Sequence, residues 1–187
     1  MTRNPHTAKE GLENPPPAAP MDYGTLDGGL VRMMNRFWAE GTLTGEAEAD
    51  RYLRTHANAV LLGMLYDQRM LAEQAFMGPQ RLEERLGHLD PARIADYDPD
   101  EFRALFAERP AVHRFTNKMA EYTQQVARIL ADEYQGNAAN IWTDVSPAEL
   151  SRRLEKLPGF GKMKAYKMRF ALHYFGWRDF SDLAPEV

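Results

Sequence analysis

Two glycines and two lysines within residues 157–164, Leu-Pro-Gly-Phe-Gly-Lys-Met-Lys, have the types and spacing to bind a phosphate group. Because Gly159 and Gly161 lack side chains, the backbone N–H groups that follow them can approach a phosphate oxygen closely. Lys162 and Lys164 add positive charge at the same place. An ordinary tight turn is the usual meaning of a lone Gly-x-Gly. The flanking Leu-Pro and lysines instead favour a contact to nucleic-acid backbone that does not read base sequence.

The neighbouring residues predict two helices joined by this hairpin, within residues 147–175. Ser146 and Glu149 have the spacing of a capping box, and Pro147 occupies the first helical position. The Pro-Gly pair at 158–159 ends the first helix. In the second helix, four apolar residues recur on one face: Met163, Tyr166, Phe170 and Tyr174. We therefore expect one packed face and one cationic face.

The charge of the chain is distributed unevenly. The 187 residues include 23 basic and 27 acidic ones, a net charge of −4, which does not by itself indicate a nucleic-acid partner. Residues 149–180 hold eight basic and three acidic residues, so this segment carries +5 and the remainder carries −9. A solvated helix face is the alternative explanation. The adjacent hairpin favours a basic surface for nucleic acid on an acidic body.

The absence of cysteine limits the chemistry open to the chain. It excludes disulfides, thiolate zinc sites and cysteine-ligated iron–sulfur clusters. No His, Asp and Glu residues have the spacing of metal ligands, so we expect no metal site and no cofactor. The N-terminus lacks a signal-peptide core, and no apolar run approaches membrane-spanning length. The sequence therefore predicts a cytoplasmic protein without a membrane partner.

The elements that would position the hairpin are all helical. Residues 1–26 are polar and proline-rich and predict a disordered tail, and residues 27–187 predict a single domain. Apolar periodicity predicts helices over 30–38, 44–54 and 117–134, with short helices after Asp90-Pro91 and Asp98-Pro99. Asn58 is expected to cap a central buried helix over 59–76. No strand alternation or repeat is visible, so we expect an all-α fold of about eight to ten helices.

The all-helical pattern with its late Leu157-to-Ala165 hairpin resembles the helix-hairpin-helix GPD superfamily, which contains endonuclease III, MutY and alkyl-base DNA glycosylases. The resemblance covers about residues 42–177. Segments 58–76, 89–120 and 136–165 are more closely similar to a bacterial branch of HhH-GPD-type base-excision repair proteins. The resemblance implies a two-lobed helical glycosylase-like fold that binds duplex DNA through Gly159, Phe160, Gly161, Lys162 and Lys164. It also implies that the hairpin carbonyls could hold a monovalent cation.

The resemblance implies a catalytic aspartate about twenty residues after the last hairpin glycine. Asp182 has this spacing, with Asp179 as the nearer alternative, and an ordinary solvated acid near the end of the chain explains either residue as well. Its role would be to stabilise positive charge on the sugar and to orient the attacking water. Members that also cut the strand use a lysine early in the second hairpin helix. That position is Met163 here, which cannot form a Schiff base.

The helix over 59–76 matches the early superfamily helix that ends at the DNA. Gln68 matches the residue that fills the space left by a flipped base, beside Arg69 at the DNA, and the alternative is an exposed helix residue. Tyr66 and Asp67 would line the pocket, with Asp67 a second candidate acid. A cap or an ion pair with Arg69 explains Asp67 equally well.

Aromatic residues near the expected pocket have two explanations. His113 could donate a hydrogen bond to a flipped base and Phe115 could stack on it, or both could pack beside the cap of the next helix. Core packing explains Trp142 and Trp177 more simply than base stacking. Together these features predict a monomeric, nucleoid-associated, monofunctional DNA glycosylase that acts on a damaged base in double-stranded DNA. The alternative is a non-catalytic protein that binds distorted DNA.

Overall fold

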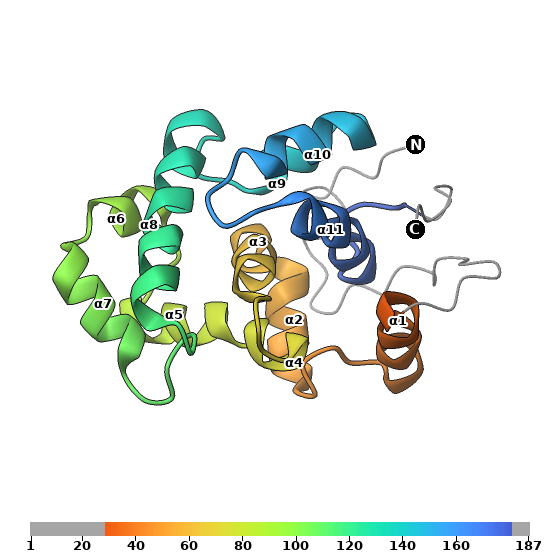
Figure 1. Ribbon diagram of the computed structural model, residues 1–187, viewed down its shortest axis with the longest axis horizontal. Helices are drawn as coiled ribbons and strands as arrows, with labels where there is room; N and C mark the ends of the chain where they lie inside the picture. The colour runs from red at the N-terminus through yellow and green to blue at the C-terminus, as the bar shows by residue number, and fades with distance from the viewer. Residues whose placement is uncertain (1–28, 181–187) are drawn as a thin grey trace.

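The computed structural model describes residues 29–180, and every regular element among them is a helix (Figure 1). The predicted tail over 1–26 and the candidate Asp182 lie outside the described residues. The helices are α1 (Gly29–Glu40), α2 (Ala47–Thr55), α3 (Ala57–Tyr66), α4 (Ala72–Ala75), α5 (Gly78–Leu86), α6 (Pro91–Asp96), α7 (Pro99–Ala107), α8 (Thr116–Glu133), α9 (Ala139–Trp142), α10 (Pro147–Glu155) and α11 (Lys162–Tyr174). The predicted all-α class is confirmed.

The helices form two groups on either side of α3. Helices α5 to α8 lie on one side, and α1, α10 and α11 lie on the other (Figure 1). Helix α3 packs against α2, α5, α8 and α11, and its residues from Ala59 to Tyr66 are all buried. The predicted central buried helix is therefore confirmed. No helix among residues 29–180 is both long enough and apolar enough to cross a bilayer.

The helix starts follow the predicted caps. The Ser146 hydroxyl accepts a hydrogen bond from the Glu149 N–H at 3.1 Å. The Asp90 and Asp98 carboxylates accept N–H groups of the first turns of α6 and α7. Each pairing satisfies a donor that has no partner within its own helix. Local sequence therefore determined where these three helices begin.

The predicted helix over 59–76 is wrong in its second half, because α3 ends at Tyr66 and residues 67–71 form a turn before α4. The carbonyl of Leu65, which would accept an N–H in a continuing helix, instead accepts from Lys164 Nζ at 2.7 Å. Arg69 then takes a left-handed φ of 53°. Short helices α5 and α9 were not predicted.

Asn58 does not cap α3, because it lies inside that helix. Its amide donates to the Gly136 carbonyl at 3.0 Å, and its carbonyl oxygen accepts from the Ala138 N–H at 2.8 Å. The side chain therefore joins α3 to the loop between α8 and α9. This long-range role uses the same polar groups that suggested a cap.

Candidate nucleic-acid interface

The hairpin between α10 and α11 is fixed by packing at its first glycine. Gly159 has a left-handed φ of 80°. A Cβ there would lie 2.6 Å from Leu65 Cδ1 on α3 and 3.0 Å from Tyr122 Cδ2 on α8. Glycine is needed at this position because the hairpin presses against the body of the protein. Phe160 is also buried, so its side chain belongs to the core.

The second glycine lies at an open helix end. Gly161 is the N-cap of α11 and supplies no side-chain acceptor for the N–H groups of the first turn. A Cβ on Gly161 would meet nothing within 4 Å, and its φ of −104° is accessible to any residue. The helix dipole adds partial positive charge at this end. An anion could therefore approach the backbone closely at Gly161, as expected. At Gly159, by contrast, glycine is required by packing against α3 and α8.

The lysines of α11 differ in their surroundings. Lys162 is exposed in the first turn. Lys164 is half-buried, and its Nζ donates to the Leu65 carbonyl at 2.7 Å and to Gln68 Oε1 at 3.2 Å. Burial lowers the pKa of Lys164 to about 8, and the nearby Asp67 carboxylate opposes that shift. Lys164 therefore joins α11 to the turn after α3, and Lys162 is the lysine open to a phosphate.

The predicted faces of α11 are partly wrong. Met163 was expected on the packed face, but its exposed fraction is 65%. Lys164 takes the place against α3, because the Leu65 carbonyl and the Gln68 side chain offer it polar partners. Residues 163 and 164 lie about 100° apart around a helix, so directing one toward α3 turns the other outward.

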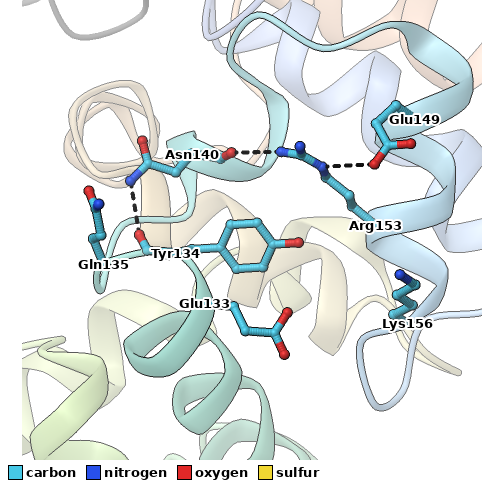
Figure 2. Close-up of a pocket in the computed structure, with 7 residues that line it drawn as sticks. All are labelled: Glu133, Tyr134, Gln135, Asn140, Glu149, Arg153 and Lys156. Atoms are coloured by element: carbon cyan, nitrogen blue, oxygen red, sulfur yellow. Dashed lines mark hydrogen bonds and ion pairs between the residues drawn. The ribbon is translucent and has the colours of Figure 1, made fainter.

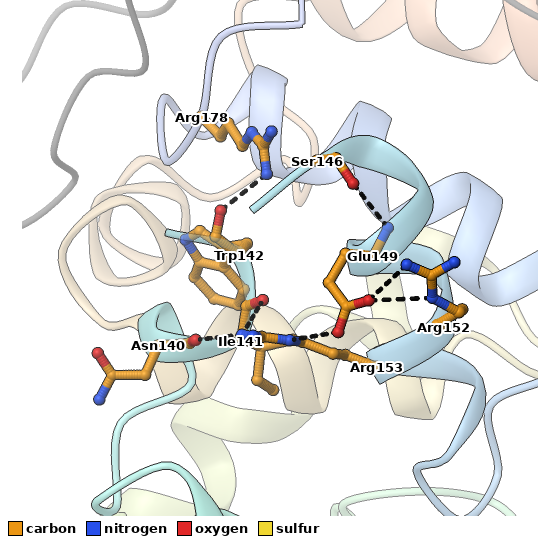
Figure 3. Close-up of polar contacts among 8 residues, drawn as sticks. All are labelled: Asn140, Ile141, Trp142, Ser146, Glu149, Arg152, Arg153 and Arg178. Atoms are coloured by element: carbon orange, nitrogen blue, oxygen red, sulfur yellow. Dashed lines mark hydrogen bonds and ion pairs between the residues drawn. The ribbon is translucent and has the colours of Figure 1, made fainter. Parts of the chain in front are cut away.

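The local charge of +5 overstates the free basic surface. Arg152 and Arg153 both pair with Glu149, at 2.7 Å and 3.2 Å (Figure 3). Arg178 is buried and donates to the backbone carbonyls of Trp142 and Val145. Guanidinium groups held in this way stabilise the fold around α9 and α10. The net charge of the segment includes these bound arginines together with the cations that face solvent.

Other segments bring basic residues to the hairpin. Exposed Arg114 donates to the Arg69 carbonyl at 3.1 Å, which places it on the turn after α3. Lys118 Nζ lies 4.6 Å from the centre of the Tyr122 ring, and Tyr122 packs against Gly159. Lys118 also pairs with Glu121 at 3.3 Å, so Arg114 is the freer of the two cations. Arg114 and Lys118 were not predicted as site residues. Their sequence signal was weak, because each is a single basic residue near the start of α8.

Two predicted pocket residues are enclosed by the protein. Tyr66 is fully buried with its hydroxyl 2.9 Å from Thr123 Oγ1. His113 Nε2 lies 2.9 Å from the Tyr66 carbonyl, and its Nδ1 accepts from the Phe115 N–H at 3.0 Å. Nε2 must therefore carry the proton, and burial lowers the pKa of His113 and keeps the ring neutral. Both ring nitrogens are occupied, so His113 offers no edge to a base in this structure.

The other aromatic candidates are packed as well. Phe115 is half-buried, with its ring centre 5.7 Å from that of His113. Trp142 and Trp177 are buried, and their rings meet edge to face at 6.0 Å. The core explanation of both tryptophans is confirmed.

The carboxylates near α11 lie at two different places. Asp67 is close to the hairpin helix, with its Oδ2 3.6 Å from Lys167 Nζ and only 12% of its side chain exposed. A narrow crevice of about 20 Å³ beside this pair is lined by α1, α4 and α11. Asp179 lies near His173 at the other end of α11, about 18 Å along the axis from Gly161. Within the described residues, Asp67 is the predicted acid that the fold brings beside the hairpin.

A wider cavity of about 440 Å³ lies between the end of α8 and α10 (Figure 2). Glu133 and Glu149 line it together with Arg153 and Lys156, and the Tyr134 ring forms part of its wall (Figure 2). The two carboxylates balance the two cations, so the cavity has no net positive charge to attract a phosphate group. Residues 29–180 also contain no group of three His, Asp or Glu side chains placed to hold a metal ion.

Comparison with known protein families shows to which superfamily the chain is related. The family model described as "HhH-GPD superfamily base excision DNA repair protein" matches residues 62–171, which run from α3 through the hairpin into α11. This chain belongs to the HhH-GPD superfamily. The match includes the turn over 67–71 and the open end of α11, so both halves of the interface lie within the family's own region. The superfamily predicted from sequence is confirmed, and the bacterial branch stays a prediction.

This HhH-GPD protein is also similar to a tRNA dimethylallyltransferase of Chlorobium limicola (strain DSM 245 / NBRC 103803 / 6330). The two are 27% identical over 106 residues, which make up 57% of this chain and 33% of the transferase. The chain therefore spans about a third of the length of that curated relative.

The two hairpin glycines provide a matched test of this geometry. Gly159→Ala should lower the free energy of unfolding by roughly 2 kcal/mol or more, because left-handed backbone and a clash with Leu65 both oppose a Cβ. Gly161→Ala should change it by about 0.5 kcal/mol or less, since the site is open. Urea unfolding would measure both, and equal losses would contradict the different roles assigned to the two glycines.

The buried amine of Lys164 should make stability depend on pH. Its pKa is about 8 in the folded chain and 10.5 ordinarily, so between these values the unfolded chain binds more protons. The contribution of Lys164 to the free energy of unfolding should then rise as pH increases from 8 toward 10. A Lys164→Met variant should lack this rise when both proteins are unfolded by urea across that range. Parallel curves for the two proteins would show that Lys164 is not desolvated.

Proposed function

We propose that this protein is a monofunctional DNA glycosylase that binds duplex DNA through its hairpin and hydrolyses the N-glycosidic bond of a damaged base. The observation that carries the proposal is the uncapped start of α11, where Gly161 leaves backbone N–H groups open beside exposed Lys162. Membership of a superfamily of base excision DNA repair proteins gives this end a ligand of matching chemistry. A phosphate of duplex DNA would accept hydrogen bonds from these N–H groups.

The protein would bind DNA by contacting backbone phosphates on both sides of the hairpin. The first turn of α11 contributes N–H groups and Lys162, and the neighbouring turn and loop contribute exposed Arg69 and Arg114. Such contacts fix the position of the protein on the duplex without reading base sequence. Repair of lesions in any sequence context requires this kind of binding.

Base removal needs a carboxylate near the sugar. Asp182 is the candidate from the resemblance, and it would stabilise the oxocarbenium-like charge and orient the attacking water. Asp67 is the second candidate, supported by its place beside α11 and its low exposure. Its ion pair with Lys167 supports a structural role instead. Replacing each carboxylate by an amide distinguishes the two candidates.

The monofunctional assignment is supported by Met163. The resemblance places this residue where strand-cutting members carry their nucleophilic lysine, and a thioether cannot attack the sugar carbon. Lys164, the next residue, has its amine bound to the Leu65 carbonyl and the Gln68 side chain. Neither residue as arranged here supplies a free amine for a Schiff base.

A non-catalytic DNA-binding protein is the second candidate function. The crevice beside Asp67 and Lys167 has a volume of about 20 Å³, which holds about one water molecule and not a base. Tyr66 and His113, expected to border the pocket, are enclosed. A glycosylase would therefore have to open this region on binding, whereas a protein that only binds distorted DNA would not.

Duplex binding should depend on the open end of α11. Lys162→Ala should weaken binding about threefold to tenfold and reduce the salt slope of log K by about one, because one phosphate contact is lost. Gly161→Ala should also weaken binding, since its methyl group blocks the approach of phosphate to the N–H groups. Electrophoretic shift or fluorescence anisotropy at several salt concentrations would measure both. Arg93→Ala on α6 is the matched control for loss of one exposed cation. Equal effects of all three changes would contradict the proposed phosphate contact.

Catalysis should leave abasic sites on one class of lesion. A panel of duplexes carrying alkylated, deaminated and oxidised bases is incubated with the protein and then treated with alkali. Asp182→Asn should reduce strand breaks on the active substrate by at least about a hundredfold, with Asp67→Asn as the comparison. Breaks before alkali would contradict the monofunctional assignment. No breaks on any duplex, with binding intact, would favour the non-catalytic protein.

A further inference from the structure

The cavity between the end of α8 and α10 takes no part in the proposed DNA contact (Figure 2). Its volume of about 440 Å³ lies within the range of pockets that hold small molecules. Gly161 and Lys162, which are proposed to contact phosphates, do not line it. The cavity is therefore a candidate site for a second kind of ligand.

The polar groups of the cavity differ in whether the protein already holds them. Arg153 pairs with Glu149 at 3.2 Å and also donates to the Asn140 carbonyl at 3.1 Å (Figure 2). Glu133 and Lys156 are both exposed, and neither side chain has a hydrogen bond or an ion pair within the part of the chain that the structure describes. A ligand can therefore bind one carboxylate and one ammonium group without displacing contacts of the fold.

Tyr134 gives the cavity an aromatic wall (Figure 2). Its backbone is held because its carbonyl accepts from the Asn140 side-chain amide at 2.9 Å and from the Asn137 N–H at 3.0 Å. Burial raises the pKa of Tyr134, with Arg153 opposing the rise and Glu133 adding to it, so the hydroxyl stays protonated. An uncharged aromatic ring beside free polar groups favours a planar ligand that stacks.

The charges of the cavity favour a neutral ligand. Two carboxylates and two cations line it, so it attracts neither a phosphate nor an organic cation by net charge. A planar neutral ligand must instead present N–H donors to Glu133 and an acceptor to Lys156. Of the DNA bases, guanine alone has two neighbouring donors, N1–H and N2–H, beside an acceptor, O6. The other bases place an acceptor directly beside their donor, where the carboxylate would repel it.

We propose that this cavity binds a guanine base that stacks on Tyr134, donates N1–H and N2–H to the Glu133 carboxylate and accepts at O6 from Lys156. The site recognises the base and not a phosphate. It is separate from the contacts proposed at Gly161 and Lys162, so it does not depend on the proposed function. A free guanosine compound and an unpaired guanine in DNA carry the same edge, and the experiment distinguishes these two sources.

The preference among nucleosides tests the recognised edge. In NMR titrations of the full chain, guanosine should bind with a Kd below about 1 mM, and adenosine, cytidine and thymidine should bind at least about tenfold more weakly. Inosine lacks the amino group of guanosine and should bind about threefold to tenfold more weakly, because one hydrogen bond to Glu133 is lost. Guanosine monophosphate should bind within about threefold of guanosine, since the cavity has no net positive charge.

Variants of the cavity test the residues. Glu133→Gln should weaken guanosine binding at least about tenfold, because an amide offers one acceptor to the two N–H donors. Asp132→Asn is the matched control, since it removes a neighbouring exposed carboxylate that does not line the cavity, and it should bind as the wild type does. Tyr134→Leu should weaken guanosine binding about tenfold through loss of stacking. Melting curves would show that each variant is folded.

A single-stranded oligothymidine with one central guanine, compared with oligothymidine alone, identifies the source of the base. Binding of guanosine without a preference between the oligonucleotides supports the site and assigns a free guanosine compound to it. A preference for the guanine-containing strand that Glu133→Gln abolishes supports the site and assigns an unpaired guanine in DNA. The proposal is overturned if neither guanosine nor that strand binds, if adenosine binds as tightly as guanosine, or if Glu133→Gln keeps the preference for guanine.

Discussion

The interface depends on one amine, Lys164 Nζ, and its bond to the carbonyl of Leu65. That carbonyl is one of the groups a helix leaves unpaired at its C-terminal end, where a cation is favoured by the dipole. The bond lets α3 end at Tyr66 and places the turn over 67–71 against the first turn of α11. Two segments of the candidate interface that are nearly a hundred residues apart in sequence thereby become neighbours.

Residues of the same type in the hairpin have different roles, since one glycine and one lysine pack against the protein and the others face solvent. Gly159 is pressed against Leu65 and Tyr122, so it fixes the hairpin to the body of the protein. Gly161 is open and leaves the start of α11 free for an anion. The same division separates the lysines, since Lys164 holds the fold together and Lys162 faces solvent. A fixed attachment to the body of the protein therefore lies directly behind an open helix end.

The charge of the surface follows from ion pairing more than from composition. Arg152, Arg153 and Arg178 lie in the basic segment but are held by Glu149 or by backbone carbonyls (Figure 3). Arg114 comes to the hairpin from a separate part of the chain, through its bond to the Arg69 carbonyl. The basic surface is therefore smaller along α10 and α11 than the sequence suggests, and it extends across to the turn after α3.

The sequence by itself determined the helical class, the hairpin, the superfamily and the caps at Ser146, Asp90 and Asp98. These features depend on contacts within a few residues, where side-chain type and spacing fix the hydrogen bonds. The end of α3, the exposure of Met163 and Leu71, and the burial of Lys164 and His113 depended on partners far along the chain. Helical periodicity shows which face of a helix is apolar. It does not show that a distant carbonyl, such as that of Leu65, will hold a lysine against the body of the protein. Only the tertiary structure decided those contacts, because the free energy of burying a polar group depends on the partner that the fold brings to it.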